Sequence, residues 1–278
     1  MSKEQEPIEN IRHSLAHLLA AAVMELWPDT KRTIGPAIET GFYFDFEFQQ
    51  PISDDDLPKI ENKMRDILPT WTTCERHELT ADEAKAEYPG NQYKHELIDE
   101  FTADGQKVSF YKTGEYWDLC KGGHADDLSK IDPKSFKLDK LAGAYWRGDE
   151  KNTMLTRIYG RAFRTSKELR QHLEMLEEAK KRDHRKLGRQ LDLFHFQDEA
   201  PGLIFWHPKG WVIWQQVEQY IRRVYQDTGY QEVKAPQILD LSLWKKTGHW
   251  DNYAENMFTT ESENRVYGLK PMNCPGHV

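Results

Sequence analysis

Two histidines stand four residues apart in the stretch RHSLAHLL near the N-terminus. His13 and His17 therefore face the same side of a helix, because positions i and i+4 are neighbours there. Cys120 and His124 repeat this spacing in DLCKGGH, with two glycines between them that allow a tight turn. Three histidines and one cysteine make a complete tetrahedral ligand set for zinc. The same imidazoles also serve as general bases without a metal, because they titrate near neutrality. The spacing alone leaves packing, metal binding and hydrolysis open.

Two charged residues are candidates to assist such a centre. Asp118 precedes Cys120 by two positions and is placed to orient an imidazole or an ammonium group. Lys94, in NQYKHELID, is a candidate to stabilise a developing oxyanion. Each is also a common type of solvated surface charge. Cys274, in PMNCPGH, has His277 three residues on, but two ligands are too few for a zinc site, and local sequence favours inert packing.

Length and composition exclude several classes of protein. The chain has 278 residues, which is room for two domains, and a formal net charge of −8, which argues against a protein covered in positive charge. Local basic patches still permit nucleic-acid binding. Its three cysteines do not make a disulfide framework and favour a reducing, cytoplasmic setting. No signal peptide is visible, and the longest apolar stretch is too short to span a bilayer, so we expect a soluble protein without membrane contact.

Periodic patterns predict the elements that position these residues. A helix is expected from an N-cap at Asn10 to a stop at Pro28, with a leucine-rich buried stripe. GFYFDFEF (41–48) alternates in a way typical of a strand with one buried face, and SDDDLPKIENKMRDIL (53–68) predicts an acid-capped helix. KVSFYKT (107–113) indicates a strand that leads toward DLCKGGH.

The amino-acid composition of the sequence changes near residue 165. TSKELRQHLEMLEEAKKRDHRKLGRQ predicts a linker helix over 165–188, whose basic second half is either a solvated face or a phosphate-facing surface. An amphipathic helix is expected over GWVIWQQVEQYIRRVYQDTGY, and a strand over QEVKAPQIL. No internal repeat is apparent. We therefore predict domains at 1–164 and 189–278, joined by the linker.

Longer strings carry a resemblance to a known family. The editing domain of bacterial-type threonyl-tRNA synthetases resembles RHSLAHLL, IGPAIETGFYFDF, DLCKGGH and LAGAYWRGDEKNTMLTRIYG. The linker and the first part of the catalytic domain of that family resemble KRDHRKLGRQLDLFHFQDEAPGLIFWHPKGWVIW, TGHWDNYAENMF and LKPMNCPGH. Alanyl-tRNA synthetases and free-standing editing proteins share only the two spaced pairs.

The resemblance implies an α+β fold: an editing domain of antiparallel sheet with a long helix, a linker helix, and an incomplete class II catalytic domain of antiparallel sheet. It implies a two-site enzyme that activates threonine with ATP and Mg²⁺ and esterifies it to tRNA(Thr). A zinc ion in the synthetic site would select the threonine hydroxyl. Serine differs by one methyl group, and such a contact discriminates only about 10–200-fold, so a second, hydrolytic site for seryl-tRNA(Thr) is expected.

The resemblance also implies roles for single residues. His13, His17, Cys120 and His124 match the editing cluster, which would hold the seryl amino group and hydroxyl and position a water. A histidine or Lys94 would assist attack on the ester. Asp118 would contact the substrate or orient a partner. The sequence leaves zinc in this cluster open, and we favour a metal-free, water-mediated mechanism.

In the synthetic half, Met272 matches a threonine-pocket residue, Cys274 the first zinc ligand, and Pro236 a proline at the dimer interface, which implies a homodimer. Phe44 stands where relatives carry tyrosine, and Gly123 replaces a proline, so we expect a less rigid turn before His124. The later class II motifs, the other two zinc ligands and the anticodon-binding domain are not found. Editing is therefore the activity expected of this chain, whose synthetic half we expect to be unstable. The alternative is a standalone tRNA-binding or trans-editing deacylase.

Overall fold

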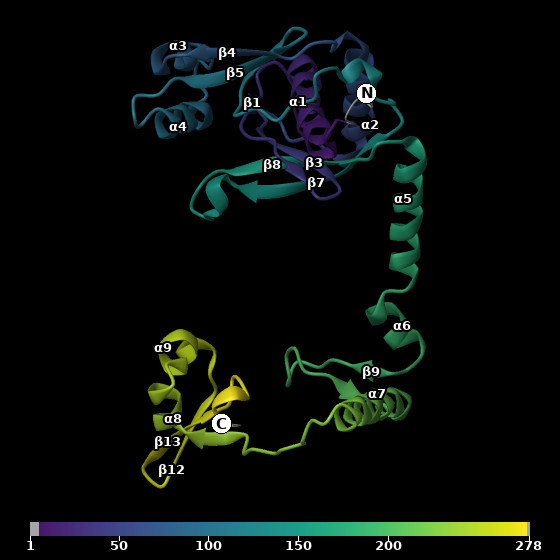
Figure 1. Cartoon of the computed structure of the whole chain (residues 1–278), viewed down its shortest axis with the longest axis vertical. Helices are drawn as coiled ribbons and strands as arrows, with labels where there is room; N and C mark the ends of the chain where they lie inside the picture. The colour runs from purple at the N-terminus through teal and green to yellow at the C-terminus, as the bar shows by residue number, and fades with distance from the viewer. Residues whose placement is uncertain (1–5, 277–278) are drawn as a thin grey trace. The chain divides into compact units, whose positions relative to one another are not determined.

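A computed structural model of the chain describes residues 6–276. Its contacts divide the chain after Lys181 into two units, and each of them combines helices with antiparallel sheet (Figure 1). Within the described part of the chain, no helix is long and apolar enough to cross a membrane. The three cysteines are free thiols.

The first unit contains two antiparallel sheets and several helices. Its helices are α1 (Ile8–Leu26), α2 (Leu57–Ile67), α3 (Ala81–Ala86), α4 (Gln92–Phe101) and α5 (Ser166–Lys181). One sheet has the order β1-β3-β8-β7, with β2 also paired to β3, and the other has the order β4-β5-β6. The strands are β1 (Lys31–Arg32), β2 (Ala37–Ile38), β3 (Gly41–Glu47), β4 (Glu75–Leu79), β5 (Val108–Thr113), β6 (Tyr116–Leu119), β7 (Phe136–Tyr145) and β8 (Met154–Ala162).

Helix α1 lies against the larger sheet and carries the first histidine pair (Figure 1). It ends at Leu26, before Pro28, as the sequence predicts. The prediction of Asn10 as its N-cap is wrong, because the helix begins at Ile8 directly after Pro7. The Asn10 amide lies inside the first turn and donates to Glu6 Oε1 at 2.8 Å. Proline has no backbone N–H that would be left without an acceptor at the start of a helix. The helix therefore starts after Pro7, earlier than a polar cap at Asn10 would place it.

The predicted strand over 41–48 is β3, at the centre of the larger sheet. Phe42, Phe44 and Phe46 point into the core that α1 covers. The opposite face of β3 is not fully exposed to solvent, because Asp45 is buried there. Its two carboxylate oxygens accept from Arg157 Nε and a terminal Arg157 nitrogen, at 2.7 and 2.8 Å. Such a planar pair satisfies both carboxylate oxygens.

Phe42 also depends on a glycine in the neighbouring strand. Phe42 and Gly160 are register partners, and a Cβ built on Gly160 would lie 2.4 Å from Phe42 Cζ. We expect Gly160→Ala to destabilise the first unit by about 1–3 kcal/mol through overpacking. Hydrogen exchange of β3 and β8 amides in urea would measure the loss. Gly143→Ala in β7 is the matched control, because its Cβ would meet only Met154, which is 64% exposed and free to move. Equal protection in the two variants would contradict the prediction.

The acid-rich segment after β3 also folds as the sequence predicts. A turn of 3₁₀ helix at Asp54–Asp56 leads into α2. Ser53 and Asp56 form a reciprocal capping box at its start, with the Ser53 amide donating to Asp56 Oδ2 at 2.9 Å. Helix α2 then packs beside α1.

The smaller sheet brings the second half of the candidate site into place. The segment KVSFYKT forms β5, which pairs with β6, and β6 ends at Leu119 immediately before Cys120. Helix α4 begins at an Asn91 cap, whose Oδ1 accepts from the Lys94 amide at 3.2 Å. Lys94 therefore sits in a fixed first turn.

The second unit is built from short elements. Its helices are α6 (His184–Gln190), α7 (Pro208–Asp227), α8 (Leu241–Lys246) and α9 (His249–Tyr253). Its strands are β9 (Phe194–His195), β10 (Phe205–Trp206), β11 (Ile238–Asp240), β12 (Thr259–Ser262) and β13 (Arg265–Leu269). They form a β9–β10 hairpin and a sheet of order β11-β13-β12.

Two predictions for this half of the sequence are wrong. The single linker helix over 165–188 is two helices, because α5 ends at Lys181 and Asp183 caps α6 by accepting from the Arg185 amide at 2.8 Å. The strand over 231–239 is reduced to its last residues in β11. Pro236 explains this, because it has no N–H to donate to a ladder and restricts the residue before it.

Many apolar side chains of the second unit are exposed. Trp211 and Trp214 on α7 are each 46% exposed, Tyr230 is 70% exposed, and Phe258 is 79% exposed. Large exposed apolar areas are typical of interaction surfaces and ligand-binding grooves. The instability expected of this half remains a prediction.

Candidate functional site

The fold brings the two spaced pairs of the sequence together. His13 and His17 come from α1, and Cys120 and His124 from the loop after β6. One nitrogen or sulfur atom from each of the four lies within 4.8 Å of the others. The Cys120 sulfur lies 3.4 Å from His13 Nε2 and 3.1 Å from His124 Nε2. The shared centre predicted from the spacing is therefore present as a geometric cluster.

The glycines of the loop give it its shape. Gly122 has φ +105° and Gly123 has φ +81°, a region that other residues rarely adopt. The carbonyl of Gly123 accepts from His13 Nδ1 at 3.2 Å, which ties the loop to α1. A proline is fixed near φ −65° and cannot take the backbone angle of Gly123. The turn of this chain therefore requires glycine where the resemblance expects proline.

His17 is the innermost of the four side chains. Its ring contacts the rings of His124 (centroids 4.4 Å apart), His13 (5.1 Å) and Tyr116 (5.7 Å). Among the residues that the structure describes, none makes a hydrogen bond to its ring nitrogens. A neutral His17 ring therefore keeps a nitrogen lone pair that accepts no hydrogen bond from the described residues.

Burial keeps the cluster uncharged. Desolvation lowers the pKa of His13, lowers the pKa of His17 well below its ordinary value, and lowers the pKa of His124 to about 3. It also raises the pKa of the Cys120 thiol to about 11. At neutral pH the cluster thus consists of neutral imidazoles and a protonated thiol.

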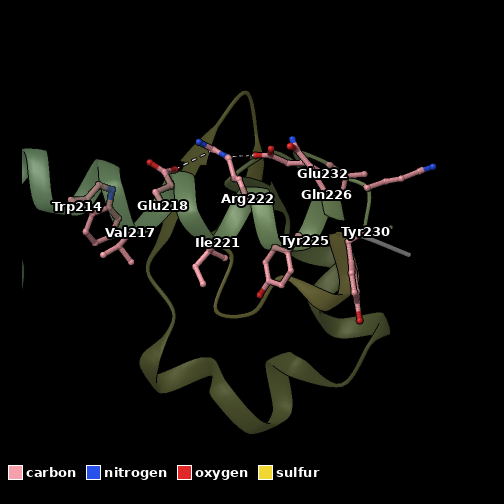
Figure 2. Close-up of a pocket in the computed structure, with 11 residues that line it drawn as sticks. Trp214, Val217, Glu218, Ile221, Arg222, Tyr225, Gln226, Tyr230 and Glu232 are labelled. Carbon is pink, nitrogen blue, oxygen red and sulfur yellow. Dashed lines mark hydrogen bonds and ion pairs between the residues drawn. The ribbon is translucent and has the colours of Figure 1, made fainter. Parts of the chain in front are cut away.

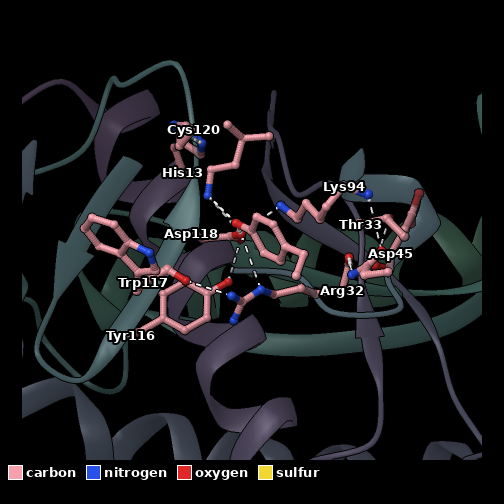
Figure 3. A network of polar contacts seen from close by, with 12 residues as sticks. His13, Arg32, Thr33, Asp45, Lys94, Tyr116, Trp117, Asp118 and Cys120 are labelled. Atoms are coloured by element: carbon pink, nitrogen blue, oxygen red, sulfur yellow. Dashed lines mark hydrogen bonds and ion pairs between the residues drawn. The ribbon is translucent and has the colours of Figure 1, made fainter. Parts of the chain in front are cut away.

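A second group of polar side chains lies beside the cluster and centres on Asp118 (Figure 3). The Asp118 carboxylate is 1% exposed and pairs with Lys94 Nζ at 2.8 Å and with Arg32 Nε at 3.3 Å. The hydroxyl groups of Tyr88 and Tyr116 donate to it at 2.5 and 2.7 Å. Lys94 is itself 2% exposed, so its ammonium charge is paired inside this network.

The network fixes the charge of Asp118. Burial alone would raise its pKa, but the opposite charges of Lys94 and Arg32 outweigh burial and hold the pKa well below the usual carboxylate range. Arg32 also lies over the rings of Tyr88 and Tyr116, at 5.2 and 5.0 Å from their centroids. Asp118 therefore remains an anion that orients Lys94.

Sequence reasoning missed Arg32, Tyr88 and Tyr116. Tyr116 is the most telling, because it donates to Asp118 and its ring faces His17. Its position two residues before Asp118 in a strand is the one available signal, since alternate residues share a face. Arg32 and Tyr88 lie far away in the sequence and offered no signal. Phe44, in contrast, is 1% exposed and stacked on Phe46, so its ring belongs to the core rather than to a substrate-facing surface.

The donor set of the cluster fits zinc. Tetrahedral zinc with nitrogen ligands near 2.0–2.1 Å and sulfur near 2.3 Å spaces its ligand atoms about 3.3–3.6 Å apart. The contacts of 3.1 and 3.4 Å and the overall limit of 4.8 Å require only small shifts to reach that spacing. His13, His17, Cys120 and His124 would hold the ion.

The predicted residues of the synthetic half belong to the second unit. Cys274 is exposed at the start of a 3₁₀ turn, and Met272 is 41% exposed. His277 lies outside the described residues. Within residues 6–276, no set of three or more ligand-type residues forms around Cys274. The residues described therefore do not make a zinc site there.

A pocket of about 550 Å³ lies on one face of α7 and the segment after it (Figure 2). Trp214, Val217 and Ile221 form part of its wall, and Arg222 bridges Glu218 and Glu232 at its edge. Its lining contains no histidine or cysteine, so the cluster on α1 is the stronger candidate for chemistry.

The chain is similar in sequence to known proteins. Residues 108–159 match the family model described as threonyl and alanyl tRNA synthetase second additional domain. The threonine–tRNA ligase of Bordetella avium (strain 197N) is 61% identical over 100% of this chain and 42% of its own length. That of Janthinobacterium sp. (strain Marseille) is 62% identical over 99% and 43%.

Among solved structures, the RNA binding domain of threonyl-tRNA synthetase from Cryptosporidium parvum Iowa II is 45% identical to this chain, with a TM-score of 0.33. The match covers 34% of this chain and 24% of the solved one. The chain spans about two fifths of the length of the curated relatives it matches. From end to end it is thus similar to a segment of the bacterial threonine–tRNA ligases, and residues 108–159 match the second additional domain of threonyl and alanyl tRNA synthetases.

Proposed function

We propose that this chain is part of a threonyl-tRNA synthetase and that its predicted N-terminal domain, residues 1–164, hydrolyses the ester of mischarged seryl-tRNA(Thr). The observation that carries the proposal is the convergence of His13, His17, Cys120 and His124 within 4.8 Å. The match of residues 108–159 to the second additional domain supports it, because these residues include two members of that cluster.

The cluster is suited to activating water. A water beside His17 would give a proton to its free ring nitrogen as the oxygen attacks the seryl carbonyl. The tetrahedral intermediate would then collapse with cleavage of the bond between the carbonyl carbon and the ribose oxygen, which releases serine. The terminal ribose oxygen of the tRNA would take the proton back from His17 and become a hydroxyl group. Donor and acceptor groups of His13, Cys120 and His124 would bind the seryl amino group and hydroxyl.

Lys94 is better suited to support this site than to contact the ester. Its ammonium group lies 2.8 Å from Asp118 and is nearly inaccessible to solvent. The pair would hold Tyr116 and, through its ring, His17 in place. We therefore assign the base to His17 rather than to Lys94.

Zinc remains compatible with the same four ligands. When bound, it would supply a Lewis acid and an acidified water to the reaction. We favour a metal-free reaction, because a buried neutral imidazole already provides the base.

Deacylation is the direct test. The 278-residue chain is incubated at neutral pH with seryl-tRNA(Thr) and, separately, with threonyl-tRNA(Thr). We expect it to release serine well above the spontaneous rate and to leave the ester of threonyl-tRNA(Thr) intact. Charged transcripts carrying another tRNA identity serve as controls for tRNA selection. Release of serine from seryl-tRNA(Thr) no faster than the spontaneous rate without the protein would refute the proposal.

Metal removal separates the two versions of the chemistry. After dialysis against a chelator, with zinc content verified by elemental analysis, we expect an unchanged rate of serine release. A rate that collapses on chelation and returns with added zinc would instead assign the metal to the reaction.

For the second unit we propose the first part of a class II catalytic domain, with 165–188 as the linker. Met272 would line the threonine pocket and Cys274 would be a zinc ligand of the synthetic site. The whole protein would then use threonine, ATP with Mg²⁺ and tRNA(Thr), and it would form a homodimer in the cytoplasm. Similarity over the length of this chain to about two fifths of the threonine–tRNA ligases, at 61 and 62% identity, supports these assignments.

A further inference from the structure

Ser14 lies between the two histidines of α1 and was not among the predicted site residues. Its side chain is buried, with 2% exposed. Its Oγ accepts from the backbone amide of Ala125 at 2.9 Å and lies 3.3 Å from His124 Nδ1. The hydroxyl therefore joins α1 to the loop that carries Cys120 and His124.

The hydrogen positions in this chain of contacts follow from one carbonyl group. Gly123 O can only accept, so the His13 Nδ1 atom 3.2 Å away carries a hydrogen. A neutral imidazole has one N–H, so His13 Nε2 is bare. The Cys120 sulfur lies 3.4 Å from that bare nitrogen and 3.9 Å from the Gly122 carbonyl oxygen, so the thiol donates its hydrogen to the nearer acceptor, His13 Nε2.

The remaining contacts are then determined in turn. The thiol hydrogen is used, so the 3.1 Å contact between Cys120 Sγ and His124 Nε2 requires an N–H on His124 Nε2. His124 Nδ1 is consequently bare and accepts from the Ser14 hydroxyl. The amide of Gly122 also donates to the sulfur, at 3.4 Å, which fits a thiol whose hydrogen points elsewhere.

We propose that Ser14 is a positioning residue that, together with the Cys120 thiol, holds His124 in the Nε2–H tautomer, so that His13 and His124 have opposite tautomers around that thiol. In the free protein, every nitrogen of those two rings and the thiol hydrogen are then engaged in internal contacts, which the seryl amino group and hydroxyl would replace on binding. His17 alone keeps a free nitrogen for water. The inference rests on the proposed ester hydrolysis only for this last consequence, since the tautomers are properties of the free protein.

Nitrogen-15 NMR of the histidine side chains is the test, because long-range proton correlations distinguish the two tautomers. The full chain, treated with a chelator and held at neutral pH, is labelled on histidine, and the signals are assigned with His→Gln variants. We expect Nδ1–H for His13 and Nε2–H for His124. In Ser14→Ala we expect His124 to lose its single tautomer and to show a mixture, while the deacylation rate falls about 10–100-fold, as for other residues that orient a functional histidine.

Ser135→Ala is the matched control. Ser135 is fully buried, and its Oγ has no hydrogen-bond partner among the described residues, so its removal tests the loss of a buried hydroxyl alone. We expect wild-type tautomers and deacylation from it.

The wild-type spectrum by itself can overturn the proposal, whatever the fold of the variant. A His124 signal with hydrogen on Nδ1, or a retained Nε2–H tautomer in a folded Ser14→Ala chain, would refute it. Correct tautomers together with no deacylation would instead refute the proposed function and leave this assignment standing.

Discussion

Replacing His17 with glutamine is expected to lower the rate of serine release from seryl-tRNA(Thr) by about 10²–10⁴-fold, the usual contribution of a general base. Glutamine keeps much of the volume of histidine in a site that is only 6% exposed, but it has no basic nitrogen. The four side chains are neutral at neutral pH, so the loss reflects proton transfer rather than charge. Single-turnover deacylation measures it, and circular dichroism reports whether the fold is kept.

His95→Gln is the matched control for this variant. His95 lies on α4, and its Nε2 contacts the carbonyl of Lys85 at 3.2 Å, outside the cluster. We expect its rate to equal that of the wild type. If His17→Gln folds and deacylates as fast as this control, the base is not His17. A selective loss of substrate affinity with an unchanged rate at saturation would place His17 in binding instead.

Replacing Asp118 with asparagine is expected to destabilise the first unit by about 3–5 kcal/mol, because it leaves the buried charges of Lys94 and Arg32 without their anion. Urea-dependent hydrogen exchange of the β5 and β6 amides would measure the loss in that unit alone. Asp104→Asn is the control, since Asp104 is exposed in the loop between α4 and β5. Equal protection in the two variants would show that the pairs to Asp118 contribute no stability.

The same carboxylate gives a prediction for pH. The pKa of Asp118 is lower in the folded protein than its unfolded value near 4, so its stabilising effect is complete above that pH and is lost as the pH falls further. The stability of the first unit in the wild type should therefore fall more steeply below about pH 4 than in Asp118→Asn. An equal fall in the stability of the wild type and of Asp118→Asn below about pH 4 would contradict this prediction.

Local patterns predicted much of the architecture because they report burial directly. The apolar stripe of α1, the alternation of β3 and the capping residues of α2 each gave the correct element. The failures lie where a backbone constraint outweighs side-chain pattern. Pro7 starts α1 ahead of Asn10, Asp183 begins a new helix inside the predicted linker, and Pro236 prevents a strand.

The site divides in the same way. The spacing of His13 with His17, and of Cys120 with His124, determined by itself that each pair would share a surface, because helix periodicity and a glycine turn act over a few residues. Only the tertiary structure decided that the pairs meet, since α1 and the loop after β6 are joined through contacts between distant segments. It also decided where Asp118 and Lys94 lie: they are buried in an ion network with Arg32, Tyr88 and Tyr116. Burial and hydrogen-bond partners are set by the packing of remote segments, and no local pattern in the sequence encodes them.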